Sequence, residues 1–415
     1  MQTESTPRPE TRAGTAFEVL CAFLWLGCTC FGGPIAHIGY FRREFVERRR
    51  WLDDAAFSDL FALCQFLPGP ASSQVGFSIG LLRAGWRGGA AAWLGFTLPS
   101  ALLMAGCASI AGRLDDTLGQ GLVHGLKLVA VAIVAQAIWD MARRLCADGP
   151  RTAIALAALA VLSVLDSAYA QFVVIGGGAL LGLAFCRNAA ASEGSAPPDA
   201  RARSSRAALP RIASIVALVA FVLLLAGLPA LEALFPSAWA LRLFDVFYRS
   251  GALVFGGGHV VLPLLQQATV AKGWISANDF LAGYGAAQAV PGPLFTFASY
   301  LGWSMSPPSR HVLGAVCATA GIFLPGLLLV IAVLPHWQTL RARPRVAALL
   351  AGANAAVVGL LASAFHTPVW TSAVRSAADF AVAVIALVLL TRWRVRPLLV
   401  VLMCAAAGIA QALVR

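Results

Sequence analysis

The sequence predicts an all-α polytopic membrane protein that consists of two homologous repeats. Three observations lead to this fold class: 59% of the 415 residues are hydrophobic, only 12% are charged, and long apolar stretches recur from about residue 15 to the last residue. Soluble proteins carry about 25% charged residues, and about 20 apolar residues in a helix cross a hydrocarbon layer of about 30 Å. The composition therefore excludes a disordered chain and argues against a soluble enzyme.

Thirteen apolar segments follow one another along the chain. Their approximate bounds are residues 15–41, 55–82, 88–112, 117–140, 152–166, 168–186, 211–234, 243–266, 277–304, 312–336, 346–366, 371–391 and 397–414. The stretch after the sixth segment is rich in Ala, Ser, Pro and Arg, a composition that cannot bury a core. We therefore expect a first membrane repeat over residues 1–186, a flexible cytoplasmic linker over 187–210, a connecting transmembrane helix over 211–234 and a second membrane repeat over 235–415.

The two repeats carry motifs that recur in the same order on both sides of the linker. Phe31-Gly32-Gly33 matches Phe255-Gly256-Gly257, and Gln65 to Pro70 matches Gln288 to Pro293, each ending in Pro-Gly-Pro. Further counterparts are Trp51 with Trp274, Gly95 with Gly321, and Pro99 with Pro325. Corresponding residues lie about 225 positions apart throughout. An ordered series of this kind indicates an internal duplication.

The seventh segment has no counterpart, so an odd number of crossings can separate corresponding elements and invert the second repeat relative to the first. Inverted repeats are typical of secondary transporters, whose substrate lies near the membrane midplane between the repeats. Arginine-rich loops of membrane proteins lie in the cytoplasm. Most arginine-rich loops of this chain lie there if segments one, two, eight and nine turn back at glycine and proline breaks. This interpretation predicts nine full crossings and four broken re-entrant elements, with a cytoplasmic amino terminus and a periplasmic carboxyl terminus. Thirteen simple crossings with the same ends are the alternative.

These four breaks, at matched positions in the two repeats, are the candidate substrate site. Backbone that leaves the helix at membrane depth has unpaired N–H and C=O groups, which are tolerated where they line a cavity. A helix that restarts after proline presents free N–H groups and a positive dipole end, which suit an oxyanion. Alternatively, these glycines and prolines are only kinks and packing points. The candidate residues are Gly32, Gly33, Pro34, Pro68, Gly69, Pro70, Gly256, Gly257, Gly258, Pro291, Gly292 and Pro293.

Polar side chains beside the Pro-Gly-Pro breaks complete the candidate site. Gln65 and Gln288 each precede the break by three residues, where their amides either contact substrate or form hydrogen bonds inside the bundle. Ser72 and Ser73 follow the first break, whereas the second repeat has Phe295 at the first of these positions. Gln74 comes next, where the second repeat has Phe297. If the serines and Gln74 bind substrate, the two repeats contribute unequally.

Ionisable residues within apolar segments are costly and are therefore functional candidates. Lys127 either attracts an anion or pairs with a carboxylate such as Asp59, and His124 would share its helix face. His37 and His259 follow the glycine breaks and are either carriers of a coupling proton or satisfied packing residues.

An arginine cluster that begins with Arg42 and Arg43 follows the first glycine break. We interpret these two residues, together with Lys127, as the anion entrance, because positive charge raises the local concentration of anions. Glu44 is expected to be a surface partner of the arginines, and Asp53 and Asp54 resemble an N-cap of the next segment. The net charge of +12 is otherwise typical of cytoplasmic loops in a membrane protein, and we expect no nucleic-acid partner.

The sequence contains no HExxH motif, no P-loop and no cluster of His, Cys and Asp ligands. We therefore expect no catalytic residues, no cofactor and no metal, and transport driven by an ion or membrane gradient. The nine cysteines lack CxxC spacing and are interpreted as small apolar core residues.

Three motifs of the first repeat resemble the chromate ion transporter family: FGGPIAHIGYFRREFVERRRWL, QFLPGP and GFTLP. FGGGHVVLPLLQQ, GWIS, QAVPGP and FLPG resemble that family's second half, so the resemblance covers nearly the whole chain and implies a long, two-domain member. It implies an inner-membrane protein that exports chromate, a sulfate-like oxyanion, and confers chromate resistance, with coupling to the proton motive force. Arg42, Arg43, Glu44 and Trp51 match the family motif together with the breaks. Lys272 stands alone where the first repeat has the arginine cluster, so the two loops are not expected to recruit the anion equally.

The expected function is that of a secondary active transporter that exports chromate across the inner membrane. A dianion that leaves a negative-inside cell gains about 2.3 kcal/mol per charge per 100 mV, so its export is electrically downhill. The alternatives are a transporter or channel for sulfate or another inorganic anion, and a receptor or scaffold without transport. The expected partners are the oxyanion, the lipid bilayer, protons and, as an oligomer, a homodimer.

Overall fold

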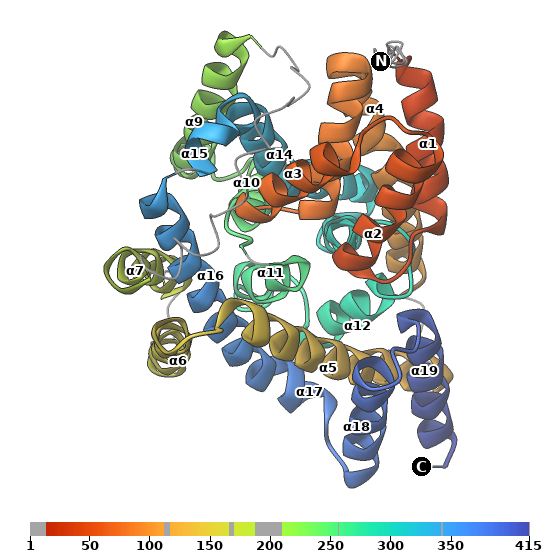
Figure 1. Ribbon diagram of the computed structural model, residues 1–415. Coiled ribbons are helices and arrows are strands. Elements are labelled where there is room, and N and C mark those ends of the chain that lie inside the picture. Colours follow the sequence, from red (N-terminus) through yellow and green to blue (C-terminus); the bar gives the residue numbers. More distant parts are fainter. Residues whose placement is uncertain are drawn as a thin grey trace, which may run out of the picture.

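A computed structural model describes residues 14–111, 117–165, 170–186, 210–255, 257–341 and 343–414. Within these residues the secondary structure is helical and no strand occurs (Figure 1), which confirms the all-α prediction. The predicted cytoplasmic tail at residues 1–13 and most of the predicted linker lie outside the described residues. So do most of the turn at Asp115-Asp116 and the turn at Asp166, which the predicted topology places outside the cell.

The first repeat forms seven helices within the described residues. They are α1 (Ala16–Thr29), α2 (Gly33–Arg42), α3 (Asp54–Phe66), α4 (Ala71–Ala111), α5 (Thr117–Leu145), α6 (Gly149–Val164) and α7 (Ala170–Phe185). A π-helical stretch over Arg43–Arg48 extends α2 into the loop before α3. Such π-helical turns are rare and are often found at functional sites.

The second repeat follows the connecting helix α9 (Arg211–Leu234) and repeats the same order of elements. Its helices are α10 (Trp239–Ala252), α11 (Val261–Thr269), α12 (Ala277–Ala287), α13 (Phe297–Ser304), α14 (His311–Val333), α15 (Trp337–Arg341), α16 (Pro344–Ala364), α17 (Thr371–Ala373), α18 (Ala377–Thr391) and α19 (Pro397–Val414). By sequence correspondence, α1, α2, α3 and α5 match α10, α11, α12 and α16, while α4 matches α13 together with α14.

Several helices begin at a residue whose side chain satisfies a free backbone N–H group. Thr15, Asp53, Asp148, Ser276 and Ser376 each accept a hydrogen bond from the backbone N–H three residues later, at the starts of α1, α3, α6, α12 and α18. The N-cap expected at Asp53-Asp54 is therefore confirmed for Asp53. Asp54 has another role, described below.

Helix α4 is a hairpin of two arms rather than one long rod. Ala84 and Gly85 leave the helical conformation, with φ of −142° and 62°. A Cβ atom on Gly80 would lie 2.3 Å from the carbonyl oxygen of Gly88, so the arms approach closely after the chain reverses. In the second repeat, Gly302 of α13 and the carbonyl of Gly314 in α14 make the same approach at 2.3 Å. Each Pro-Gly-Pro break is therefore followed by a short helix that folds back onto a longer one.

The two repeats interlock through their central helices. Helix α5 of the first repeat packs against α18 and α19 of the second, and α16 of the second packs against α6 and α7 of the first. Small residues allow these approaches: Gly125 of α5 lies on Cys404 of α19, and Gly352 of α16 lies on Gly178 and Gly182 of α7. This close packing at glycine is typical of membrane helices. The repeats are thus separate in sequence but share one packed body.

Among the described residues, six helical stretches are long and apolar enough to cross a membrane. They are Ala71–Ala111, Thr117–Leu145, Arg211–Leu234, Pro308–His336, Pro344–Ala373 and Pro397–Val414. The most apolar is α9, with a mean hydropathy of 2.7, and its side chains Ile212 and Leu223 are 74% and 65% exposed. Large apolar side chains facing outward are expected where lipid is the solvent. The chain is therefore a multi-pass membrane protein.

Candidate anion site at the paired helix breaks

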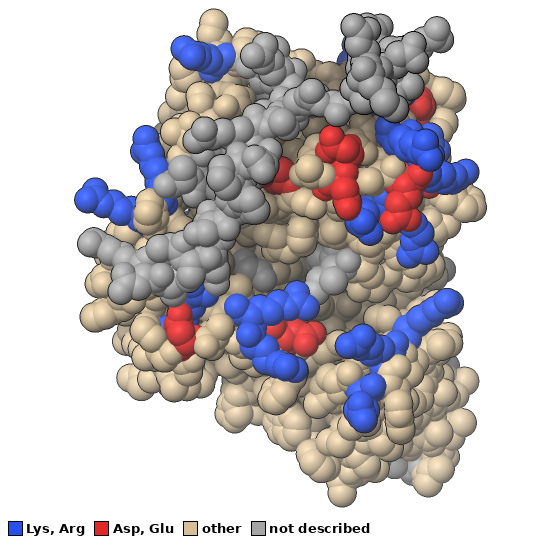
Figure 2. Space-filling model, viewed as in Figure 1, with Lys and Arg blue, Asp and Glu red and all other residues tan. Residues whose placement is uncertain are grey.

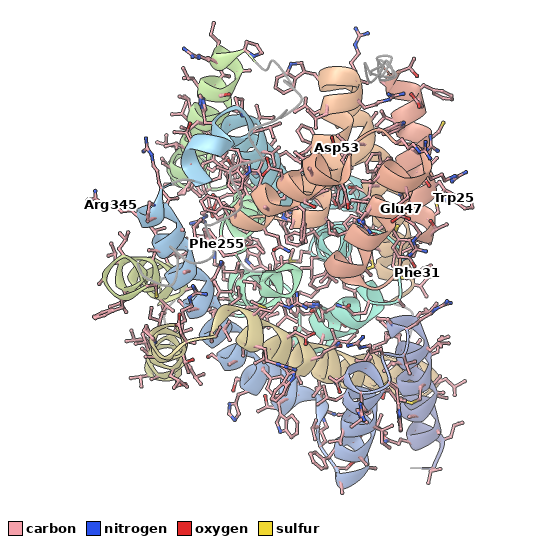
Figure 3. All side chains as sticks on the ribbon, in the orientation of Figure 1. Trp25, Phe31, Glu47, Asp53, Phe255 and Arg345 are labelled. Atoms are coloured by element: carbon pink, nitrogen blue, oxygen red, sulfur yellow. The ribbon has the colours of Figure 1, made fainter. Side chains whose placement is uncertain are left out.

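Each Pro-Gly-Pro break contacts the residue before the Phe-Gly-Gly motif of the other repeat, and two equivalent hydrogen bonds cross from one repeat to the other at these contacts. The N–H of Gly69, in the first Pro-Gly-Pro, donates to the carbonyl of Val254 at 2.7 Å. The N–H of Gly292, in the second Pro-Gly-Pro, donates to the carbonyl of Cys30 at 2.8 Å. Val254 and Cys30 each directly precede the Phe-Gly-Gly motif of their repeat, and the phenylalanines of the two motifs are labelled in Figure 3. Each repeat thus holds the break of the other.

Both central glycines of the Pro-Gly-Pro motifs occupy positions that another residue would strain. Gly69 has a φ of 122° and Gly292 a φ of 95°, in the left-handed region. A Cβ on Gly69 would lie 3.0 Å from the Cα of Gly326, and a Cβ on Gly292 would lie 2.8 Å from the Cβ of Ser100. Gly326 and Ser100 are themselves equivalent, because each follows the proline of its long helix. The close contact therefore obeys the same pseudo-symmetry as the hydrogen bonds.

Side chains pair the carbonyl groups that the breaks leave free. The amide Nε2 of Gln74 donates to the carbonyl of Pro68 at 2.9 Å and to that of Gly326 at 3.1 Å. In the second repeat, Thr296 Oγ1 donates to the carbonyl of Pro293 at 2.8 Å and contacts the hydroxyl of Ser100. Backbone inside a membrane protein requires such partners.

Buried polar atoms gather beside the first Pro-Gly-Pro break, at the start of α4. His37 of α2 is 1% exposed, and its Nδ1 lies 3.4 Å from Ser72 Oγ. Four atoms here are buried without a partner among the described residues: His37 Nε2, Ser73 Oγ, Gln74 Oε1 and Thr97 Oγ1. A buried polar atom left without a hydrogen bond costs about 1–3 kcal/mol. These atoms can supply hydrogen bonds to a ligand at the N-terminal end of α4.

The glycine breaks differ between the repeats. Gly32 and Gly33, with φ of 104° and 80°, lead into α2, whose next residue is Pro34. Gly257, with a φ of 150°, leads into a 3-10 turn that starts at the buried Gly258. Gly256 lies outside the described residues.

The polar residues of the second repeat are bonded to one another more fully. His259 Nδ1 lies 2.8 Å from the hydroxyl of Tyr284 on α12. Gln288 is half-buried at the end of α12, and its Nε2 is among the buried atoms without a partner in the described residues. Where the first repeat has Ser72, the second has the buried Phe295. The two breaks are therefore chemically unequal, and more buried polar atoms without a partner among the described residues lie beside the first.

Two predicted site residues lie elsewhere. Gln65 is exposed on the last turn of α3, so the structure does not bring it into the buried site. Lys127 lies on α5, where its Nζ donates to Asn278 Oδ1 at 3.0 Å and to the carbonyl of Ser372 at 3.4 Å. The suggested pairing of Lys127 with Asp59 is wrong, because Asp59 accepts a hydrogen bond from the indole of Trp337 at 3.3 Å instead.

The arginine cluster forms ion pairs in the loop between α2 and α3, outside the six candidate spans. Arg42 binds both oxygens of Asp54, at 2.8 and 2.9 Å, and Glu47 at 3.3 Å. The hydrogen bond from Arg42 holds the pKa of the Asp54 carboxyl below its usual value. Arg43 stacks on the ring of Tyr40 at 5.4 Å. Figure 2 shows these acidic and basic side chains close together over α2 and α3. The charge of Arg42, one of the two arginines predicted at the anion entrance, is therefore compensated by carboxylates.

Glu44 is buried, whereas the sequence predicts it at the surface. It is 8% exposed and accepts hydrogen bonds from Arg48 at 3.0 Å and from Arg49 at 2.5 Å. Burial alone would raise the pKa of Glu44, but the hydrogen bonds from Arg49 and Arg48 outweigh it and hold the pKa below its ordinary value. Arg49 and Arg83 both lie over the ring of Trp51. Ion pairs and cation–π contacts therefore connect the side chains of this loop to one another.

Two clefts that the sequence did not indicate lie beside α11, the helix after the second glycine break. One, of about 830 Å³, has Gln171, Gln267 and His366 among its lining residues. The other, of about 350 Å³, shares Gln171 and Gln267 and adds Arg249 and Lys272. Polar side chains and two cations thus line open space on one side of the second break.

One serine has the spacing of a hydrolase nucleophile, in Gly76-Phe77-Ser78-Ile79-Gly80. In the structure Ser78 lies inside α4 and its hydroxyl donates to the carbonyl of Gln74 at 2.7 Å. A nucleophile elbow requires a sharp turn between a strand and a helix. Because Ser78 lies within a helix, this motif does not form such an elbow.

Curated proteins named as transporters are similar to this chain in sequence. The chain is 29% identical over 366 residues to the chromate transport protein of Pseudomonas aeruginosa, covering 86% of this chain and 81% of that one. It is 25% identical over 379 residues to the chromate transport protein of Cupriavidus metallidurans, covering 90% and 86%. An uncharacterized transporter of Bacillus subtilis matches at 28% identity over 128 residues, 31% of this chain and 70% of that one. No solved structure matches.

The model of the family described as chromate transporter matches the chain twice, over residues 17–183 and 241–409. These two regions correspond to the two repeats recognised from the Phe-Gly-Gly and Pro-Gly-Pro motifs, and together they include most of the chain. This chain belongs to the chromate transporter family.

Proposed function

We propose that this protein is a secondary active transporter that exports chromate across the inner membrane, with the oxyanion bound at the paired helix breaks. The observation that carries the proposal is the pair of hydrogen bonds from Gly69 to Val254 and from Gly292 to Cys30. They pair each Pro-Gly-Pro break with the chain at the glycine break of the other repeat, and secondary transporters bind substrate at such interruptions between repeats. The curated relatives named as chromate transport proteins support chromate as the substrate.

The anion site itself is proposed at the start of α4. Free backbone N–H groups and the positive end of the helix dipole favour a negative ligand there. Ser73 Oγ and His37 Nε2 are buried and without partners among the described residues, and both can donate hydrogen bonds to an oxyanion. Gln74 holds the break in shape through its two carbonyl partners. Hydroxyl, imidazole and backbone N–H donors together suit a tetrahedral oxyanion.

The membrane potential is the proposed driving force. For a dianion leaving a negative-inside cell, about 2.3 kcal/mol per charge per 100 mV amounts to about 4.6 kcal/mol at 100 mV. In this proposal the loop around Arg42 and Arg43 faces the cytoplasm, the carboxyl terminus lies outside, and export confers chromate resistance. His37 and His259 remain candidates for proton coupling, and the proposal assigns no catalytic role to the chain. A passive anion channel and a sulfate transporter are the competing functions.

Chromate uptake into inverted membrane vesicles tests this proposal. We expect saturable uptake that requires the membrane potential and is competed by sulfate. Ser73→Ala should weaken uptake, whereas Ser109→Ala is the matched control, because the exposed Ser109 hydroxyl bonds only the carbonyl of Gly106 in its own helix. Equal chromate uptake by both variants would contradict an anion site at the start of α4. Non-saturable flux would favour a channel.

A further inference from the structure

A second cluster of charged side chains is buried where α5 of the first repeat meets α18 of the second. Asp379, in the first turn of α18, is fully buried. Its Oδ1 lies 2.8 Å from His124 Nε2 on α5, and its Oδ2 accepts the backbone N–H of Arg375 at 3.0 Å. Lys127 lies one helical turn from His124 on the same face of α5. Asn278, which contacts Lys127, is at the opposite end of α12 from the Pro-Gly-Pro break.

Lys127 carries a buried charge that only neutral acceptors contact directly. It is 3% exposed, and Asn278 Oδ1 and the carbonyl of Ser372 accept its hydrogen bonds. Among the ion pairs of the described residues, none includes Lys127. A buried ammonium needs compensation, and Asp379 supplies it only through space. An anion beside Lys127 would compensate this charge directly.

The histidine and lysine of this cluster have no counterpart at the equivalent contact of the other repeat. By sequence correspondence, His124 and Lys127 of α5 match Ala351 and Asn354 of α16. Helix α16 packs on α6 and α7 without these two charges, and the start of α6 there has an Arg151–Asp148 ion pair instead. The interlocked fold therefore does not require a histidine and a lysine on the central helix. Ionisable groups buried in a membrane protein are costly and mark function by default.

The charged groups around the pair come from few elements. Helix α5 contributes His124 and Lys127, and the turn before α18 contributes Arg375. Helix α12 contributes Asp279, whose carboxylate accepts a hydrogen bond from Ser276 at the start of its own helix. Helices α17 and α19 contribute no charged side chain, and the π-helical stretch Phe365–Trp370, which also packs on α5, contributes the exposed His366. The His124–Asp379 pair is thus the one buried acid–base pair of this contact among the described residues.

We propose that the His124–Asp379 pair binds a proton whose uptake is coupled to an oxyanion passing Lys127. This inference rests on the proposed oxyanion transport. An anion beside Lys127 is repelled by the negative charge of Asp379. When the imidazole of His124 takes one proton from water, this repulsion is relieved, because the resulting imidazolium is hydrogen-bonded to the carboxylate. Linkage is reciprocal, so acid then favours anion binding to the same extent. A dianion exported with one proton still carries one net negative charge outward, so the membrane potential still drives export.

Proton uptake on chromate binding tests the coupling with the purified full chain. The probe is chromate added in weak buffer with a pH indicator dye at about pH 8, where a free imidazole is almost wholly neutral. We expect wild-type protein to take up about one proton per bound anion, and its Kd to change by up to about tenfold per pH unit. Asp379→Asn and His124→Gln should bind chromate without proton uptake, and their Kd should depend less on pH. His336→Gln, at an exposed histidine, is the control and should behave as wild type.

The outcomes separate this inference from the proposed function. Wild-type protein that binds no chromate contradicts the proposed function itself. Wild-type protein that binds chromate without taking up a proton contradicts only the proton site. Proton uptake that persists in both folded variants, judged by gel filtration and thermal unfolding, also overturns the inference. Glutamine at position 124 keeps a hydrogen-bond donor for Asp379, so His124→Gln provides the test should Asp379→Asn not fold.

Discussion

Replacing Gly292 by alanine tests how tightly the two breaks are held against each other. The φ of Gly292 is 95°, in a region where a side chain costs about 1–2 kcal/mol. The added Cβ would lie 2.8 Å from the Cβ of Ser100 and 3.2 Å from the carbonyl oxygen of Phe96, both in the opposite repeat. Relieving such an overlap in a packed interior costs about 1–3 kcal/mol.

The two terms together predict a loss of about 2–5 kcal/mol of stability for Gly292→Ala. The matched control is Gly106→Ala, since Gly106 lies within α4 and a Cβ there would have no neighbour within 4 Å. Alanine at an open helical position is favoured over glycine by about 1 kcal/mol, so this control should be neutral or stabilising.

Thermal unfolding in detergent, followed by tryptophan fluorescence, measures the difference between these variants. We expect a lower midpoint for Gly292→Ala and an unchanged or higher one for Gly106→Ala. Flux in vesicles should fall for Gly292→Ala alone, because the hydrogen bond to Cys30 would be displaced. Equal midpoints and equal flux in the two variants would refute the close contact of the breaks.

Three other changes have definite expected outcomes. Gln74→Leu should lower the stability by about 1–3 kcal/mol for each of the two carbonyl groups that it leaves without a donor. Denaturation of the detergent-solubilised protein measures this loss. An unchanged stability would mean that other groups donate to these carbonyls. Because its two arginine partners hold the pKa of Glu44 low, this carboxylate stabilises the fold above its unfolded-state pKa, and the contribution disappears as pH falls through the lower folded-state pKa. Glu44→Gln should therefore flatten the acid limb of a stability–pH curve, and an unchanged limb would contradict the pairing. Lys127→Met should reduce chromate flux with little loss of stability, since it removes a buried charge; wild-type flux would exclude Lys127 from the anion path.

Much of the fold could be predicted from the sequence because the signals are local. Apolar length, the repeated order of motifs and the proline and glycine breaks identified the helices, the duplication and the interruptions. Asp53 was expected as an N-cap for a local reason, since its carboxylate reaches the N–H of Ala56 only three residues away.

The contacts between distant helices could not be predicted in this way. No sequence spacing indicates that the carbonyls of Cys30 and Val254 accept hydrogen bonds from the opposite repeat, because each pair is more than 180 residues apart. Asp379 shows the same limit. In the sequence, Ser376 and Asp379 resemble a helix start, and only the packing of α18 on α5 places that carboxylate against His124. For Gln65, the distance from the break along the sequence does not reveal which way the side chain faces.

Gln74 and Thr296 illustrate the intermediate case. Both follow a Pro-Gly-Pro break, where a polar residue can pair free carbonyl groups, and both do so in the structure. Their position beside the breaks predicts a polar role, while their actual partners depend on the neighbouring long helices.

The most direct test of the paired-break site is equilibrium binding of chromate to purified protein carrying Ser72→Ala and Ser73→Ala together, compared with Ser109→Ala. Losing hydrogen bonds to a charged ligand costs about 1.5–3 kcal/mol each, or at least tenfold in Kd. We predict that the double variant remains folded and binds chromate at least tenfold more weakly, while Ser109→Ala binds as wild type does. Unchanged affinity in the folded double variant would contradict the anion site at the start of α4.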